Sequence, residues 1–202
     1  MPKLIDWGVR FDLMREAVVR LAARGGAGAV TLPAVAAELR VSPSTLRRTL
    51  DSPAVLAPMG VAWIARQRRY PRYRGRPKGV EHGSPEHAAV LLARELPDGD
   101  ESLERERAWR ELTGRDACPE VIELRDDHDA YLDALANHAV GVTLPDATSL
   151  QREVILLRAV MDGLTAAACR GSITLEQAHD ALDHYLAALS GREARPVSPD
   201  AA

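Results

Sequence analysis

Apolar residues recur at spacings of three and four along most of the chain, and alternation of apolar and polar residues at a period of two is hard to find. Because this periodicity is typical of amphipathic helices, the sequence predicts an all-α protein. The first helix is predicted over residues 10–24, where the apolar run ends at Gly25-Gly26, a common signal at a helix C-terminus. One face of this helix carries Leu13, Met14, Ala17, Val18, Leu21 and Ala22.

Two short helices are predicted next, each with a hydroxyl side chain at its N-cap and an early proline. Thr31 precedes Leu32-Pro33, and Ser42 precedes Pro43. A hydroxyl at the N-cap accepts a backbone N–H of the first turn, and that turn tolerates proline. These signals predict helices over 32–39 and 43–50.

Six further helices complete the predicted all-α chain. In the fourth helix, Pro58 and Gly60 predict a kink or a late start before Val61 to Tyr70. Later helices are predicted over 86–95, 101–113, 119–140, 149–170 and 174–189, with Ser102, Thr148 and Thr174 as candidate N-caps. The last two helices carry apolar stripes at four-three spacing, formed by Leu150, Val154, Leu157, Met161, Leu164 and Ala168, and by Ala178, Leu182, Tyr185 and Leu189.

Charge divides the chain into two parts of opposite sign. Residues 1–80 hold 15 Lys and Arg against 5 Asp and Glu, whereas residues 81–202 hold 11 against 24. This segregation suggests a module that binds a polyanion, joined to an acidic module with another role. A basic half can equally be a solvated surface, so charge alone does not identify nucleic acid as the partner.

The helix over 43–50 adds the chemistry that charge alone lacks. Leu46 and Leu50 lie one turn apart on its buried side, which leaves Ser44, Thr45, Arg47 and Arg48 on the other faces. Hydroxyls bind phosphates or bases, and guanidinium groups suit bidentate contact with guanine. Two short helices joined by a tight connection and supported by a preceding helix place the second one in a major groove. We therefore predict an N-terminal helix-turn-helix that binds DNA.

Residues 30–46 resemble the helix-turn-helix signature of the TetR family. The resemblance is carried by Val30-Thr31-Leu32-Pro33-Ala34-Val35-Ala36 and by Arg40-Val41-Ser42-Pro43-Ser44-Thr45-Leu46. The chain departs from the family pattern at three places. Arg40 replaces the glycine of the turn, and Pro53 replaces a lysine that follows the recognition helix. The aromatic residues of the recognition helix are replaced within the run Arg47 to Leu50. The resemblance implies DNA contact from Thr31, Ser42, Ser44, Thr45, Arg47 and Arg48.

The resemblance also implies a larger helical regulatory and dimerisation domain (TetR-like) behind the helix-turn-helix. In the family the last two helices form a dimeric four-helix bundle, so the expected interface is Leu157, Met161, Leu164, Ala168, Ala178, Leu182, Tyr185 and Leu189. The same stripes can instead be buried against their own domain. Expected effector-binding residues are Trp109, Leu112, Tyr131 and Leu135, for which a core role is the alternative.

These inferences give an expected domain plan and an expected set of partners. The plan is a helix-turn-helix DNA-binding domain over 1–52, a connecting helix and basic linker over 53–80, a ligand-binding and dimerisation domain over 81–190, and a disordered C-terminal tail over 191–202. The basic segment 66–78 is open to three interpretations: contact with DNA, contact with the acidic domain, or a mobile loop. The expected partners are an operator in double-stranded DNA, a largely apolar small-molecule effector and a second copy of the chain.

Other classes of function find less support in the sequence. The six histidines form no HExxH or similar metal-binding pattern, and neither a GxSxG elbow nor a phosphate-binding glycine loop is present. We expect no cofactor, no metal and no enzyme activity. The absence of a long apolar run and of CxxC spacing around Cys118 and Cys169 favours a cytoplasmic protein without a membrane partner. The alternative is a helical protein-interaction module or a small helical enzyme whose basic half binds another protein.

Overall fold

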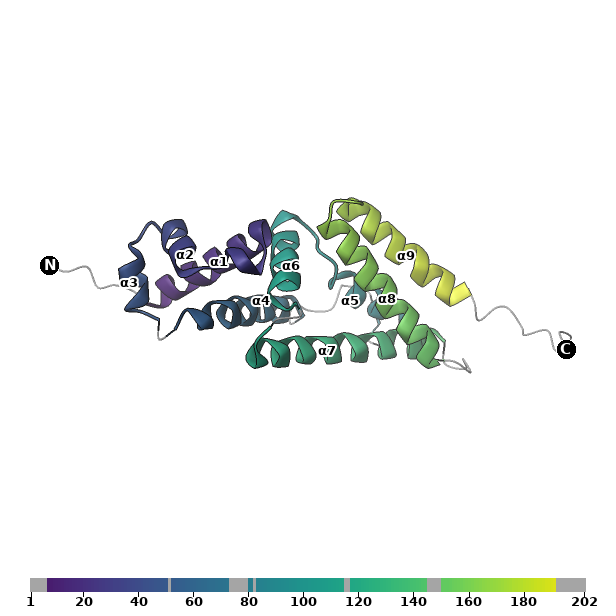
Figure 1. Cartoon of the computed structure of the whole chain (residues 1–202). Coiled ribbons are helices and arrows are strands. Elements are labelled where there is room, and N and C mark those ends of the chain that lie inside the picture. The colour runs from purple at the N-terminus through teal and green to yellow at the C-terminus, as the bar shows by residue number, and fades with distance from the viewer. Residues whose placement is uncertain are drawn as a thin grey trace, which may run out of the picture. The chain divides into compact units, whose positions relative to one another are not determined.

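The computed structural model describes residues 7–50, 52–72, 80–81, 83–114, 117–144 and 150–191, and in these ranges it contains helices and no strand. The predicted all-α class is confirmed (Figure 1). The helices are α1 (Trp7–Gly25), α2 (Leu32–Glu38), α3 (Pro43–Arg47), α4 (Leu56–Arg72), α5 (Pro85–Ala93), α6 (Asp100–Leu112), α7 (Pro119–Thr143), α8 (Leu150–Cys169) and α9 (Leu175–Gly191), with short 3-10 turns at Ala27–Ala29 and Pro53–Val55.

Side-chain caps start several of these helices where the sequence predicted them. Thr31 Oγ1 accepts the Ala34 N–H at 3.3 Å, Ser42 Oγ accepts the Thr45 N–H at 3.2 Å, and Thr174 Oγ1 accepts the Gln177 N–H at 3.1 Å. The prediction for Ser102 is wrong, because α6 already begins at Asp100 and Ser102 lies inside the helix. Thr148 lies outside the described residues.

Several predicted helix bounds differ from the structure: α1 begins at Trp7 rather than at residue 10, and α7 ends at Thr143 rather than at residue 140. The fourth helix does not start late, because α4 begins at Leu56 and contains both Pro58 and Gly60. Pro58 falls in the first turn, where a backbone N–H has no acceptor within the helix, so the proline removes no hydrogen bond there. The third helix is shorter than expected, since α3 ends at Arg47 and a turn follows.

The chain packs as two compact units, one made of Met1–Tyr70 with Asp100–His128 and the other of Pro71–Gly99 with Asp129–Ala202. We call them the N-terminal unit and the regulatory unit. Packing therefore groups α6 and the first part of α7 with α1 to α4, whereas the boundaries expected at residues 52 and 80 rest on composition alone. Those boundaries stay a prediction about domains, and the predicted tail lies outside the described residues beyond position 191.

The N-terminal unit has one apolar core that joins the helix-turn-helix to α4 and α6. Helix α1 packs along α6, and its Ala17, Val18 and Ala22 are fully buried. The rest of the unit contributes Leu32, Val35, Ala36, Leu46, Leu50, Leu56, Val61, Ile64, Ala108, Trp109, Leu112 and Val121. The stripe predicted on the first helix is confirmed at most positions, but Leu13 is 46% exposed.

Gly60 is required where α4 comes close to α1 and α6, and we expect Gly60→Ala to destabilise this unit. A Cβ at this position would lie 2.6 Å from Val18 Cγ1 and 3.2 Å from Leu112 Cδ1. Overpacking a core costs about 1–3 kcal/mol. This cost exceeds the roughly 1 kcal/mol that alanine contributes over glycine in a helix. The matched control is Gly141→Ala in α7, where no atom lies within 4 Å of the added Cβ. Urea unfolding of both variants checks the prediction, and a stabilised Gly60→Ala protein would contradict it.

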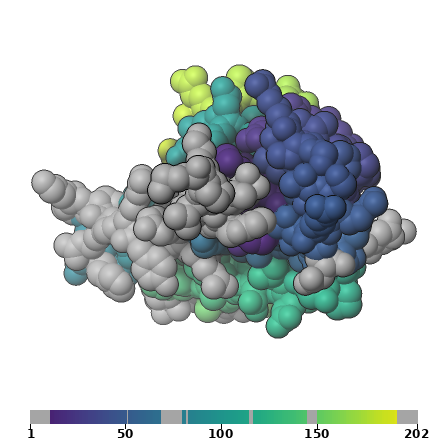
Figure 2. All heavy atoms as spheres, turned by 90° about the vertical axis from the view of Figure 1, so that its left-hand side faces the viewer, coloured from purple at the N-terminus to yellow at the C-terminus, as the bar shows by residue number. Residues whose placement is uncertain are grey.

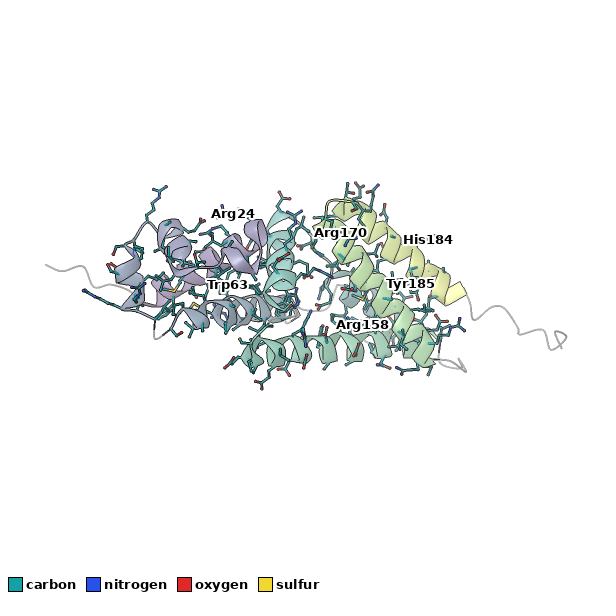
Figure 3. The ribbon with its side chains drawn as sticks, viewed as in Figure 1. Arg24, Trp63, Arg158, Arg170, His184 and Tyr185 are labelled. Atoms are coloured by element: carbon teal, nitrogen blue, oxygen red, sulfur yellow. The ribbon has the colours of Figure 1, made fainter. Side chains whose placement is uncertain are left out.

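The core of the regulatory unit is formed by α5, α7, α8 and α9. Its fully buried side chains include Leu92, Ala136, Val140, Leu157, Leu182 and Leu189. Polar contacts surround this core. Tyr131 donates to Glu95 at 3.1 Å, and His179 Nε2 lies 3.0 Å from the Pro97 carbonyl oxygen. Arg158 pairs with Asp133 at 2.8 Å and with Asp129 at 3.3 Å. Figure 3 labels Arg158 on α8.

Candidate nucleic-acid interface

An ion-pair cluster fixes α2, and with it the start of α3, on α1. The Glu38 carboxylate accepts from Arg20 at 2.9 Å and from Arg24, labelled in Figure 3, at 2.8 Å. These hydrogen bonds, from Arg20 first and then Arg24, lower the pKa of Glu38 below its usual range despite partial burial. The helix that precedes the turn is thus held by two charge-assisted contacts as well as by apolar packing.

The short helix α3 has one buried side and one polar, exposed side. Leu46 and, after the helix, Leu50 face the core, as predicted. At its start, Ser42 Oγ lies 2.9 Å from Ser44 Oγ and 2.7 Å from Thr45 Oγ1. Each of these three side chains is exposed. The structure therefore brings the predicted hydroxyls together at one end of α3, where they can bind phosphate oxygens or base edges.

Arg47 and Arg48, at the other end of α3, are exposed, and in the part of the chain that the structure describes their guanidinium groups form no ion pair or hydrogen bond. Several other arginines of the N-terminal unit are paired: Arg15 with Asp12, Arg20 and Arg24 with Glu38, and Arg66 with Asp12. Figure 2 shows atoms of the α2–α3 region on the face turned to the viewer. Unpaired guanidiniums on an exposed helix can bind phosphates or bases, and the side chains of Arg47 and Arg48 are accessible for such contact.

Thr31 has a structural role at the start of α2. Its hydroxyl caps α2, and the residue is exposed. A hydroxyl that accepts a backbone N–H keeps its own proton and can still donate it to a phosphate. DNA contact from Thr31 therefore stays a prediction, and it is compatible with the cap.

Arg68 of the predicted basic segment is tied into the N-terminal unit. Its guanidinium pairs with Glu106 of α6, donates to His128 Nε2 of α7 at 2.6 Å, and stacks on Trp109 at 4.3 Å from the ring centroid. Glu106 also accepts from Arg110 at 3.1 Å, and the rings of Trp109 and His128 meet edge to face at 5.2 Å. We call these five residues the Arg68 cluster. Sequence reasoning missed it, because its members are far apart in the chain. Residues 73–78 of the basic segment lie outside the described ranges.

The predicted effector residues fall in two different units. Trp109 and Leu112 are buried in the core of the N-terminal unit, whereas Tyr131 and Leu135 belong to the core cluster of the regulatory unit. The regulatory unit has a cavity of about 200 Å³. It is lined by Pro85, Glu86, Ala88, Ala89, Ala139, Thr143, Asp183, Leu186, Ala187 and Ser190, a set that contains none of the four predicted residues.

The stripes expected to form a dimer interface face the inside of the chain at most positions. Leu157, Leu182 and Leu189 are fully buried, and Met161, Ala168 and Ala178 are at most 4% exposed. Leu164 and Tyr185 are partly buried and pack against the same core. The six buried side chains therefore belong to the core of their own unit, which is the alternative that the sequence leaves open. The opposite faces of α8 and α9 remain accessible, as the exposed His184 beside Tyr185 illustrates (Figure 3).

Neither a metal site nor a membrane-spanning helix is found among the described residues. No group of three or more His, Cys, Asp or Glu side chains there is arranged to hold a metal ion. In the same ranges, no helix is long and apolar enough to cross a membrane.

Known proteins resemble this chain in fold rather than in sequence. No family model and no curated protein matches the chain by sequence. Among solved structures, a TetR-like transcriptional regulator from Rhodococcus sp. RHA1 matches with a TM-score of 0.66 at 20% identity, over 96% of this chain and 98% of that one. A second transcriptional regulator from Rhodococcus sp. Rha1 matches with a TM-score of 0.71 at 16% identity, over 94% and 99%. A candidate transcriptional regulator from Saccharomonospora viridis, in complex with choline, matches with a TM-score of 0.73 at 17% identity, over 89% and 96%. The chain has the fold of TetR-type regulators.

Proposed function

We propose that this protein is a ligand-responsive transcriptional repressor that binds a pseudo-palindromic operator as a homodimer. The observation that carries the proposal is the capped helix-turn-helix whose α3 presents Arg47 and Arg48 without ion-pair partners among the described residues. The similarity of the fold to regulators of the TetR type supports it over nearly the whole chain. In this proposal two copies of α3 enter successive major grooves, so the operator repeats its half-site with the symmetry of the dimer.

The proposed dimer uses the outer faces of α8 and α9. On α8, Ile155 is 59% exposed, and Ala159, Gly163 and Ala166 follow it at spacings of four, four and three on the same side. No atom lies within 4 Å of a Cβ built on Gly163, so the surface there is open. On α9, Ala181 and Ala188 are exposed at a spacing of seven. Small side chains at these positions allow another helix to approach closely.

The proposed effector binds the regulatory unit and weakens operator binding by favouring a second conformation. A tenfold loss of operator affinity requires only about 1.4 kcal/mol of difference in effector affinity between the two conformations. The similar Saccharomonospora viridis structure contains choline, which supports a small organic molecule as the effector class. The largely apolar character expected from the sequence stays a prediction, because the described cavity also carries the carboxylates of Glu86 and Asp183.

A gel-shift titration with the DNA that flanks the protein's own gene tests this function. We expect a discrete complex that forms at lower protein concentration than with scrambled DNA of the same length, and whose affinity falls steeply with salt. Equal affinity for both DNAs would contradict a repressor. No binding to either would favour the protein-interaction module.

Arg47 and Arg48 are expected to have different roles on the operator, because neighbouring positions on a helix point about 100° apart. We assign base contact to Arg48 and phosphate contact to Arg47. Arg48→Ala should cost about 1–3 kcal/mol and relax the preference at one operator position. Arg47→Ala should weaken operator and scrambled DNA alike and reduce the salt slope by about 0.9 for each phosphate that is no longer neutralised.

Titrations of both variants at several salt concentrations decide this assignment. The control is Arg170→Ala, which removes an exposed arginine of the regulatory unit and should change neither quantity. The reverse pattern in the two α3 variants would overturn the assignment, and no effect in either would exclude α3 as the reading helix.

A further inference from the structure

Arg40 occupies a backbone conformation that favours glycine. Its φ is +55°, and it is the one non-glycine residue with positive φ in the ranges that the structure describes. The Arg40 N–H donates to the Ala37 carbonyl at 3.0 Å, and the Val41 N–H donates to the Ala36 carbonyl at 2.9 Å. This pair of bonds is the Schellman motif that ends α2, with Arg40 at the left-handed position. A side chain there is strained, because Cβ approaches the following carbonyl oxygen.

Another helix of the chain ends in the same motif, with glycine at the left-handed position. At the end of α8, the Gly171 N–H donates to Ala168 at 3.0 Å and the Ser172 N–H donates to Ala167 at 2.9 Å. Gly171 has a φ of +72°. The backbone geometry of the motif therefore does not itself require arginine at position 40. Strain that persists where glycine would remove it points to a use for the side chain.

The surroundings of Arg40 indicate that use. Arg40 is exposed, and within the described ranges its guanidinium has no ion-pair or hydrogen-bond partner. It stands two residues ahead of Ser42, the cap of α3. Residues 40–50, from this turn to the end of the recognition segment, contain Arg40, Arg47 and Arg48 and no acidic residue. A long cationic side chain beside a groove-binding helix meets the phosphates that border the groove.

We propose that Arg40 binds a backbone phosphate of the operator at the edge of the major groove that α3 enters. This inference rests on the proposed DNA binding and adds a contact at the turn that precedes α3. A phosphate contact carries no sequence information, so it contributes equally to operator and non-specific DNA. In this proposal the backbone strain at Arg40 lowers the stability of the free protein, and the phosphate contact of its side chain strengthens the complex with DNA.

Arg40→Gly separates these two effects, because it should stabilise the protein and weaken the complex. We expect the melting temperature of the N-terminal unit to rise by a few degrees as the strain is removed. We expect affinity for operator and scrambled DNA to fall by the same factor, roughly tenfold. The slope of log affinity against log salt should fall by about 0.9 for each protomer. Tryptophan fluorescence follows the melting, since Trp7, Trp63 and Trp109 all belong to this unit.

Two further variants serve as controls. Arg40→Lys keeps the charge and the strain, so its salt slope should match the wild type. Gly171→Ala introduces strain into the matching motif at the end of α8, so it should lower stability and leave the DNA salt slope unchanged. A stabilised Arg40→Gly protein with wild-type affinity and slope would overturn the proposal, as would a loss confined to the operator. Failure of the wild type to bind any DNA would instead refute the proposed function.

Discussion

Replacing Ile155 by arginine is expected to give folded monomers and to weaken operator binding by about 10²–10⁴-fold. Ile155 is 59% exposed on the outer face of α8, so the charge disturbs no core of its own chain. In a dimer that uses this face, the arginine charge would be buried without an opposite charge beside it, which is strongly unfavourable. A monomer loses the second half-site and with it the avidity that links two binding events.

Sedimentation velocity, circular dichroism and operator titration together check this result. Leu157→Arg is the contrasting variant, because Leu157 is fully buried and the charge should unfold the regulatory unit rather than separate folded protomers. Ala134→Arg places the same charge on an exposed site of α7 and should change neither mass nor affinity. An unchanged dimer in the Ile155→Arg protein would show that the outer face of α8 is not the interface.

Replacing Arg68 by alanine is expected to destabilise the N-terminal unit by about 2–3 kcal/mol. The side chains of Arg68 and Glu106 are only 16% and 13% exposed, so removal of the cation leaves a mostly buried carboxylate. Breaking a buried ion pair costs about 3–5 kcal/mol, and Arg110, which still donates to Glu106, reduces that cost. Removal of the stacking on Trp109 and of the hydrogen bond to His128 adds to the effect.

Urea unfolding followed by tryptophan fluorescence measures this change, and two variants serve as controls. Arg66→Ala, two residues earlier on α4, breaks an exposed pair at 3.5 Å and should cost less than about 1 kcal/mol. Arg68→Lys should fall between the two, because an ammonium keeps the charge but not the planar fork. Equal stability of the Arg68→Ala and Arg66→Ala proteins would show that the Arg68 cluster contributes nothing.

The helices and the helix-turn-helix follow from the sequence alone. Caps such as Thr31 and Ser42 act on backbone groups three residues away, and an apolar face repeats within two turns, so both signals are contained in short stretches of chain. The same locality explains why the exposed set on α3 is predictable: once Leu46 and Leu50 face inward, Arg47 and Arg48 must point elsewhere.

What covers each apolar face, and which charges are paired, depends instead on tertiary packing. The stripe through Leu157 is visible in the sequence, but a stripe looks the same whether its own chain or a partner covers it, and here its own chain does. Arg68 resembles part of a basic surface in the sequence, yet its partners Glu106 and His128 lie 38 and 60 residues away. Gly60 has the local character of a helix breaker, whereas its role is set by Val18 on another helix. Contacts of this kind depend on how helices distant in sequence pack, which local periodicity and capping do not encode.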